Sequence, residues 1–153
     1  MKIWIDTEFN EKDGELLSIA LVNEYGKVFY SELPTSDIEV APWVQENVLC
    51  HFKKENENHY VLVRERIGHI IATESEKEEV EVIADHPADI WYFSKILSDY
   101  VAVRDHSVDF SVKMTVLKNA NPESKQPHHA YFDALALRDL HLTPPYNHLS
   151  NNL

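Results

Sequence analysis

The stretch Lys2–Phe9, KIWIDTEF, decides how the chain is interpreted. Residues Lys2–Ile5 are rich in strand formers and run directly into Asp6-Thr7-Glu8. Side chains two apart on a strand share a face, so Asp6 and Glu8 are expected to point the same way. Open α/β sheets hold their ligands at such strand ends. An Asp-x-Glu triplet alone occurs by chance in about every other chain of this length, so its context must decide.

Two further strand candidates follow this stretch. Leu16–Val22 and Lys27–Tyr30 are apolar segments that flank residues 23–26, Asn-Glu-Tyr-Gly. The spacing predicts a hairpin in which Gly26 takes a positive φ. The first 30 residues therefore predict a meander of three strands.

The remainder of the chain alternates predicted helices with one more predicted strand. Helices are expected at Pro42–Leu49, Arg64–Ser75, Asp89–Leu97 and Ala130–Leu140, and a strand at Val80–Ala84. The segment Val108–Leu117 receives no assignment. A meander followed by this alternation predicts an α/β fold with a mixed sheet.

Length and composition favour a single intracellular domain. The chain has 153 residues, of which 44% are hydrophobic, and one cysteine, Cys50. We expect one domain over residues 1–142 and a C-terminal tail over residues 143–153. No apolar run approaches the roughly 20 residues that span a bilayer, so no membrane contact and a cytoplasmic location are expected.

The charge is strongly acidic, with 14 basic and 26 acidic residues and a net charge of −12. This balance argues against a protein that grips a long duplex through a wide basic surface. It does not exclude an enzyme that holds only the end of a strand through bound cations, because those cations place positive charge where a phosphate binds.

A second candidate site lies between the strand at Val80–Ala84 and the helix after it. Asp85 follows the strand directly, and Asp89 stands near the expected start of the helix. Either aspartate could bind a metal. In the alternative interpretation one of them caps the helix and the other is solvated.

A third candidate site is the pair His128 and Asp133. Residues five apart on a helix lie about 140° apart around its axis, so both cannot share a helical face. His128 is therefore expected in the loop before the helix, with Asp133 on its first or second turn facing the sheet. Ala130 and Ala134 are small enough to let this helix approach closely. The alternative is an exposed histidine and an exposed aspartate.

Three other histidines are expected to be solvated. These are His51, His59 and His141.

The three sites, in this order, resemble the motifs of the DEDDh 3′–5′ exonucleases. The opening Asp-Thr-Glu-Phe, the segment Leu-Leu-Ser-Ile-Ala-Leu-Val and Trp43-Val44 before Val48-Leu49 are similar to the RNase AS-like exoribonucleases of that superfamily. The resemblance runs from Ile3 to about Leu140. The chain departs from the pattern at Asp85 and Ala88, where the family often has asparagine and an aromatic residue.

This resemblance implies an RNase H-like fold, a five-stranded mixed sheet with helices on both faces. It assigns Asp6, Glu8, Asp89 and Asp133 to two Mg²⁺ or Mn²⁺ ions. His128 becomes the general base that takes a proton from the attacking water, and Glu8 also takes part in catalysis. The implied activity is 3′–5′ hydrolysis of single-stranded RNA that releases nucleoside 5′-monophosphates.

Substrate contacts are assigned to Thr7 and Phe9. Phe9 either stacks beside the last base or belongs to the core, and Trp43 is expected in the core. The resemblance implies RNA as the partner, with adenylate ends preferred, and is compatible with a homodimer. The alternatives are the same chemistry on DNA and a non-catalytic acidic protein that mimics nucleic acid.

Overall fold

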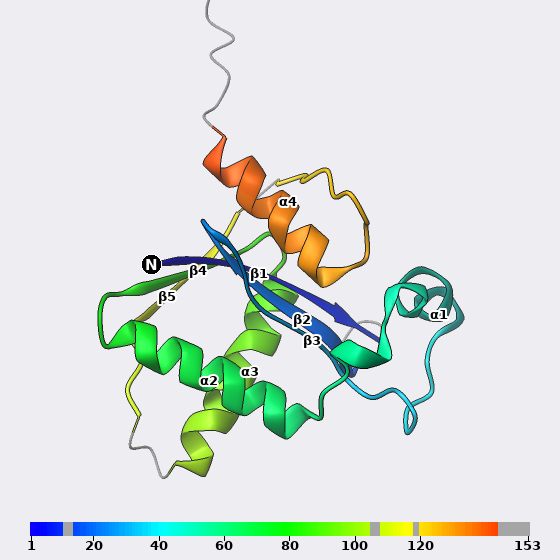
Figure 1. The fold of residues 1–153 in the computed structure, drawn as a ribbon, viewed down its shortest axis with the longest axis horizontal. Coiled ribbons are helices and arrows are strands. Elements are labelled where there is room, and N and C mark those ends of the chain that lie inside the picture. The colour runs from blue at the N-terminus through cyan, green and yellow to red at the C-terminus, as the bar shows by residue number, and fades with distance from the viewer. Residues whose placement is uncertain (11–13, 105–107, 118–119, 144–153) are drawn as a thin grey trace, which may run out of the picture.

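The computed structural model describes residues 1–10, 14–104, 108–117 and 120–143. Its centre is a five-stranded mixed sheet in the order β3-β2-β1-β4-β5 (Figure 1). The strands are β1 (Lys2–Phe9), β2 (Leu16–Asn23), β3 (Gly26–Glu32), β4 (Val80–Ala84) and β5 (Val112–Val116). Strand β1 pairs antiparallel with β2 and parallel with β4, β2 pairs antiparallel with β3, and β4 pairs parallel with β5. The predicted α/β class with a mixed sheet is confirmed.

The predicted hairpin between β2 and β3 is also confirmed. The side-chain oxygen Oδ1 of Asn23 accepts hydrogen bonds from the backbone N–H groups of Tyr25 at 2.9 Å and Gly26 at 3.1 Å. Gly26 has φ = 133°, in the region that glycine adopts most easily. The turn thus follows from local sequence.

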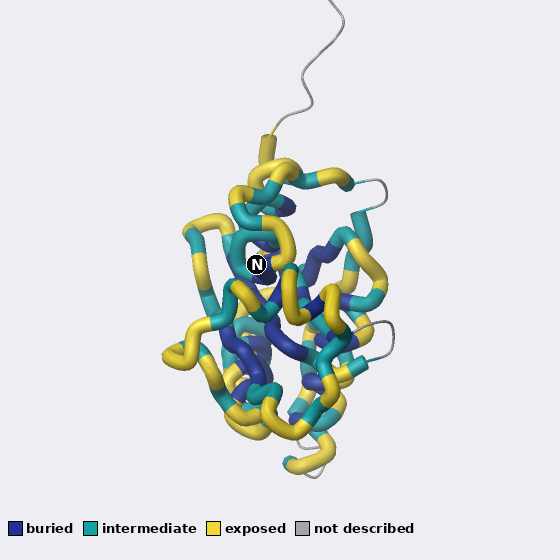
Figure 2. Tube along the Cα trace, turned by 90° about the vertical axis from the view of Figure 1, so that its right-hand side faces the viewer, coloured by how far each residue is buried: buried dark blue, intermediate teal, exposed yellow. Residues whose placement is uncertain are grey.

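Helices cover both faces of the sheet (Figure 1). They are α1 (Pro42–Asn47), α2 (Tyr60–Ser75), α3 (Pro87–Val103) and α4 (Ala130–Leu142), with two short 3₁₀ turns at Leu49–His51 and Lys54–Asn56. Helices α2 and α3 pack on one face, and α4 packs on the other. Figure 2 shows that the buried stretches of the chain lie mostly inside the fold, with exposed stretches around them.

Helices α2 and α3 are several residues longer than predicted, and α4 is longer by two residues. Helix α2 begins at Tyr60 rather than Arg64, and α3 continues to Val103 rather than ending at Leu97. The end of α3 is held by Tyr100, which is 4% exposed. A Cβ atom at Gly68 of α2 would lie 2.1 Å from the Tyr100 ring, so the two helices approach closely because position 68 is glycine.

Strand β5 lies within Val108–Leu117, for which the sequence pattern predicts no element. Among the described strands, β5 is an edge strand that pairs only with β4, and none of its residues is fully buried. A short edge strand of this kind has a weak hydrophobic pattern. The predicted tail lies outside the described residues from 144 onward. Within the described part of the chain, no helix has the length and apolar character that crossing a bilayer requires.

Candidate metal centre

Strand β1 places the first two carboxylates on one face of the sheet. Ile3 and Ile5 point into the core beneath α2 and α3, whereas Trp4 points into the core beneath α4. Because side chains alternate along a strand, Asp6 and Glu8 continue the Trp4 face. The predicted common orientation of the two carboxylates therefore follows from the register of β1.

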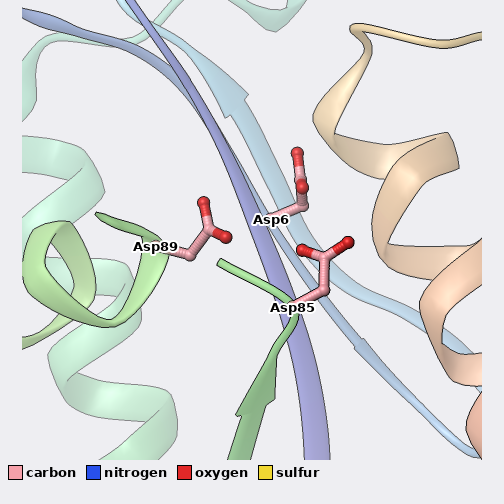
Figure 3. A group of neighbouring side chains, drawn as sticks. All are labelled: Asp6, Asp85 and Asp89. Carbon is pink, nitrogen blue, oxygen red and sulfur yellow. The ribbon is translucent and has the colours of Figure 1, made fainter. Parts of the chain in front are cut away.

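The segment between β4 and α3 brings two aspartates to the same place. Asp85 follows β4 directly, and Asp89 lies in the first turn of α3, where it is 2% exposed. One carboxylate oxygen from each of Asp6, Asp85 and Asp89 lies within 4.8 Å of the others. Figure 3 shows the three side chains converging from β1, from the end of β4 and from the start of α3.

Helix α4, on the face of the sheet opposite to α3, supplies a further carboxylate. Ala130 and Ala134 are fully buried against the sheet, so the first turn of α4 lies close to β1. Oxygens of Asp6, Glu8 and Asp133 lie within 4.8 Å of one another. Asp6 thus belongs to two groups of three carboxylates, one including Asp89 and one including Asp133.

Two carboxylate oxygens in this cluster are buried without a hydrogen-bond partner. Asp89 receives two hydrogen bonds from Thr7 on Oδ1, while its buried Oδ2 receives none. Asp133 accepts a hydrogen bond on Oδ2 from the backbone N–H of His128 at 2.9 Å, while its buried Oδ1 has no partner. Buried polar atoms are nearly always satisfied, so these two oxygens call for a ligand.

Burial and mutual repulsion disfavour the charged forms of these groups. The pKa of Asp6 is raised well above its usual value by burial first, then by Asp89, Glu8, Asp133 and Asp85. Burial, followed by Asp133 and Asp89, raises the pKa of Glu8 to about 8.

The pKa values of the two aspartates near the start of α3, Asp85 and Asp89, are also raised. Burial raises the pKa of Asp89 to about 6, although the Thr7 hydroxyl bond opposes the shift. Burial also raises the pKa of Asp85. No ion pair among the described residues includes any of the five carboxylates. Divalent cations with oxygen ligands would relieve this unbalanced charge, so the residues fit a metal site.

The start of α3 decides between the two interpretations of Asp85 and Asp89. His86 is the N-cap residue, because its Nδ1 accepts a hydrogen bond from the backbone N–H of Ala88 at 3.1 Å. Neither aspartate caps the helix, and neither is fully solvated. The alternative of one cap and one solvated aspartate is therefore wrong.

His128 lies in the loop before α4, as predicted, and has φ = 64°. Histidine is among the non-glycine residues that tolerate this left-handed conformation. Its exposed ring contacts the ring of Trp43 edge-on, with centroids 4.9 Å apart. The backbone bond to Asp133 and the contact with Trp43 together hold His128 beside the carboxylate cluster.

A cavity of about 290 Å³ opens next to Glu8. Its walls are formed by Glu8 and Phe9 from β1 and by four residues near α1, which are Ala41, Trp43, Val44 and Val48. Trp43 is 54% exposed, so the expectation that it belongs to the core is wrong. Phe9 stacks on Tyr92 at 5.2 Å and is half-buried, which leaves part of its surface for the cavity.

A larger cavity of about 480 Å³ lies beside α3. Trp91, Tyr92 and Tyr60 contribute to its walls. None of the five carboxylates lines it, so it is separate from the carboxylate cluster.

Asn10 was not singled out from the sequence, and it positions the cavity wall. Its amide donates hydrogen bonds to Glu15 and to the backbone oxygen of Glu39, and its Oδ1 accepts one from the N–H of Ala41. These bonds attach the start of α1, which carries Trp43, to the end of β1. The only sequence signal was a polar residue directly after Asp-Thr-Glu-Phe.

Two further residues have hydrogen-bond partners within the fold. Thr7 is 5% exposed and donates its hydroxyl to Asp89, so its side chain lies beneath the carboxylates and positions Asp89; its assignment to substrate contact stays a prediction. His141 is not simply solvated, because its Nδ1 accepts a hydrogen bond from the indole of Trp4 at 3.0 Å. His59 is exposed, as expected, and His51 is half-buried.

Comparisons with known proteins add no family to this description. Neither a scan against protein-family models nor a search of curated proteins finds a match. The functional argument therefore depends on the geometry of the site.

Proposed function

We propose that this chain is a metal-dependent 3′–5′ exoribonuclease with an RNase H-like fold. The observation that carries the proposal is the membership of Asp6 in two groups of three carboxylates. Such sharing suits two neighbouring divalent cations bridged by one aspartate. The five-stranded mixed sheet with helices on both faces is the architecture that the resemblance of the sequence implies.

Four of the five carboxylates have a place in this proposal. Asp6, Glu8 and Asp133 would hold one Mg²⁺ or Mn²⁺ ion, and Asp6 with Asp89 would hold the other. When bound, the two ions stabilise the entering and leaving oxygens of an in-line displacement at phosphorus. The orphan oxygens of Asp89 and Asp133 support the assignment, because each would gain a partner.

His128 is the proposed general base. A neutral imidazole can accept the proton of an attacking water at neutral pH. The exposed ring is accessible to solvent, and the backbone of the same residue is bonded to the proposed ligand Asp133. His128 would thus provide the proton acceptor through its ring, while its backbone holds Asp133, a proposed ligand of the cation.

The cavity beside Glu8 is the proposed site of the terminal nucleoside. Trp43 and Phe9 provide aromatic surface on which a base can stack, and Glu8 can accept a hydrogen bond from the terminal 3′-hydroxyl. A net charge of −12 opposes long contacts with a phosphate backbone. The charge and the cavity therefore favour the 3′ end of a single strand as the substrate. That this strand is RNA, with adenylate ends preferred, is what the resemblance of the sequence implies.

The test uses two strands of one sequence, RNA and DNA, each labelled at its 5′ end. With Mn²⁺ or Mg²⁺ we expect the RNA to shorten stepwise from its 3′ end and to release nucleoside 5′-monophosphates. Chelation should stop the reaction. Faster shortening of the DNA would assign the activity to DNA, and no shortening of either strand would contradict a nuclease.

A further inference from the structure

We propose that Asp85 is a fifth carboxylate ligand, which with Asp6 and Asp89 holds the second divalent cation before any substrate arrives. This inference rests on the proposed two-cation function and extends it. It gives a role to one of the two positions at which the sequence departs from the exonuclease pattern.

The distances between the carboxylate oxygens of Asp6, Asp85 and Asp89 suit the binding of one cation. One oxygen from each of Asp6, Asp85 and Asp89 lies within 4.8 Å of the others. Oxygens that bind one Mg²⁺ at 2.0–2.1 Å stand roughly 3–4 Å apart, so only a small inward movement is needed. The three side chains lie beside one another, and each comes from a different segment of the fold (Figure 3).

Asp89 provides an independent indication of a missing ligand. Its side chain is 2% exposed, and its Oδ2 is buried with no hydrogen-bond partner. The other oxygen is fully occupied by Thr7. The oxygen that is left over belongs to the carboxylate that faces Asp6 and Asp85 in Figure 3.

Asp85 neither caps a helix nor forms an ion pair with a lysine or arginine of the described residues. The cap of α3 is His86, so Asp85 does not serve the helix terminus. Among the residues that the structure describes, no lysine or arginine forms an ion pair with Asp85. A half-buried aspartate without a cap or an ion pair costs stability in the absence of a cation.

With a third carboxylate, the second cation can bind before the substrate does. A position with only two protein carboxylates relies on phosphate oxygens of the substrate to complete its coordination. With Asp85 included, three carboxylates surround the position in the free protein. The second cation should therefore bind without nucleotide.

The test counts Mn²⁺ ions bound to the full chain in the absence of nucleotide, by calorimetry and by electron paramagnetic resonance. We expect two ions on the unaltered protein. Asp85→Asn should retain one ion and bind the second at least about tenfold more weakly. The matched control is Asp139→Asn on α4, an exposed aspartate paired with Arg138, which should still bind two.

Folding is checked separately by thermal unfolding in chelator, where Asp85→Asn should be at least as stable as the unaltered protein because a repelling charge is gone. Asp85→Ser serves as a second neutral variant. Two ions bound with unchanged affinity by either variant would overturn the role of Asp85. A single ion on the unaltered protein would overturn the proposal that Asp85 helps to hold a second cation before substrate arrives, whereas no bound ion would contradict the proposed function itself.

Discussion

Thr7 donates two hydrogen bonds to the same oxygen of Asp89, one from its backbone N–H at 3.0 Å and one from its hydroxyl at 2.6 Å. The two residues are 82 positions apart and lie on β1 and α3. Because Oδ1 is occupied in this way, Oδ2 is the oxygen that remains for a cation. The strand that carries Asp6 thus also orients Asp89.

Replacing Thr7 by valine should weaken the second cation without disrupting the strand. Valine keeps the branched shape and the backbone N–H, and it loses only the hydroxyl bond to Asp89. Loss of such a supporting bond typically lowers metal affinity by about 10–100-fold. Mn²⁺ titration of Thr7→Val checks this, and Thr7→Ser should restore the affinity. Unchanged Mn²⁺ binding by Thr7→Val would show that the hydroxyl does not position Asp89.

Stability of the metal-free protein should fall as the pH rises. Burial and neighbouring carboxylates raise the pKa of Glu8 from 4.5 to about 8, and burial raises that of Asp89 from 3.8 to about 6. Between these values the folded chain binds more protons than the unfolded chain, so the free energy of unfolding decreases with pH. The stabilisation is complete below the unfolded pKa values and is lost above pH about 8.

Denaturant unfolding in chelator and in Mn²⁺, measured at pH values from 5 to 8, checks this dependence. Mn²⁺ should add most stability at the highest pH, because it binds the deprotonated carboxylates. Glu8→Gln should flatten the dependence seen in chelator. A free energy of unfolding that rises with pH in chelator would contradict the electrostatic account.

Replacing His128 by alanine should separate catalysis from metal binding. The hydrogen bond to Asp133 comes from the backbone, so alanine keeps it and loses only the imidazole. We expect kcat to fall by about 10²–10⁴-fold, with Mn²⁺ binding unchanged. His128→Asn, which tolerates the left-handed conformation, should be equally inactive and controls for backbone strain. An alanine variant that retains activity would remove the base assignment.

Replacing Trp43 by alanine should weaken nucleotide binding and leave the cations in place. Stacking of one base on an aromatic side chain contributes about 1–3 kcal/mol. Titration with adenosine 5′-monophosphate in the presence of Mn²⁺ measures the loss. Trp91→Ala is the matched control, because Trp91 is 55% exposed and Trp43 is 54% exposed, but Trp91 lines the other cavity. Equal losses in the two variants would argue against the cavity beside Glu8.

The centre of the fold could be predicted from local patterns. Ile3, Ile5 and Trp4 alternate along β1, and that alternation alone places Asp6 and Glu8 on one face. The loop position of His128 followed from helix geometry, since five residues do not bring two side chains to one helical face.

Other features depended on contacts that the sequence does not display. The length of α3 reflects the packing of Tyr100 against Gly68. The exposure of Trp43 depends on where Asn10 fixes the start of α1, 31 residues along the chain. Whether Asp85 caps a helix or faces a cluster was decided by His86, whose capping bond has no distinctive sequence signal.

The central claim, that Asp6 is shared by two cations in a nuclease, is tested most directly by one rate. That rate is the initial 3′-end shortening of single-stranded RNA in Mn²⁺, compared between Asp6→Asn and the exposed control Asp139→Asn. Because Asp6 belongs to both carboxylate groups, its loss should lower the rate by on the order of a hundredfold or more, while the control should match the unaltered protein. Equal rates for Asp6→Asn and the control would contradict the account.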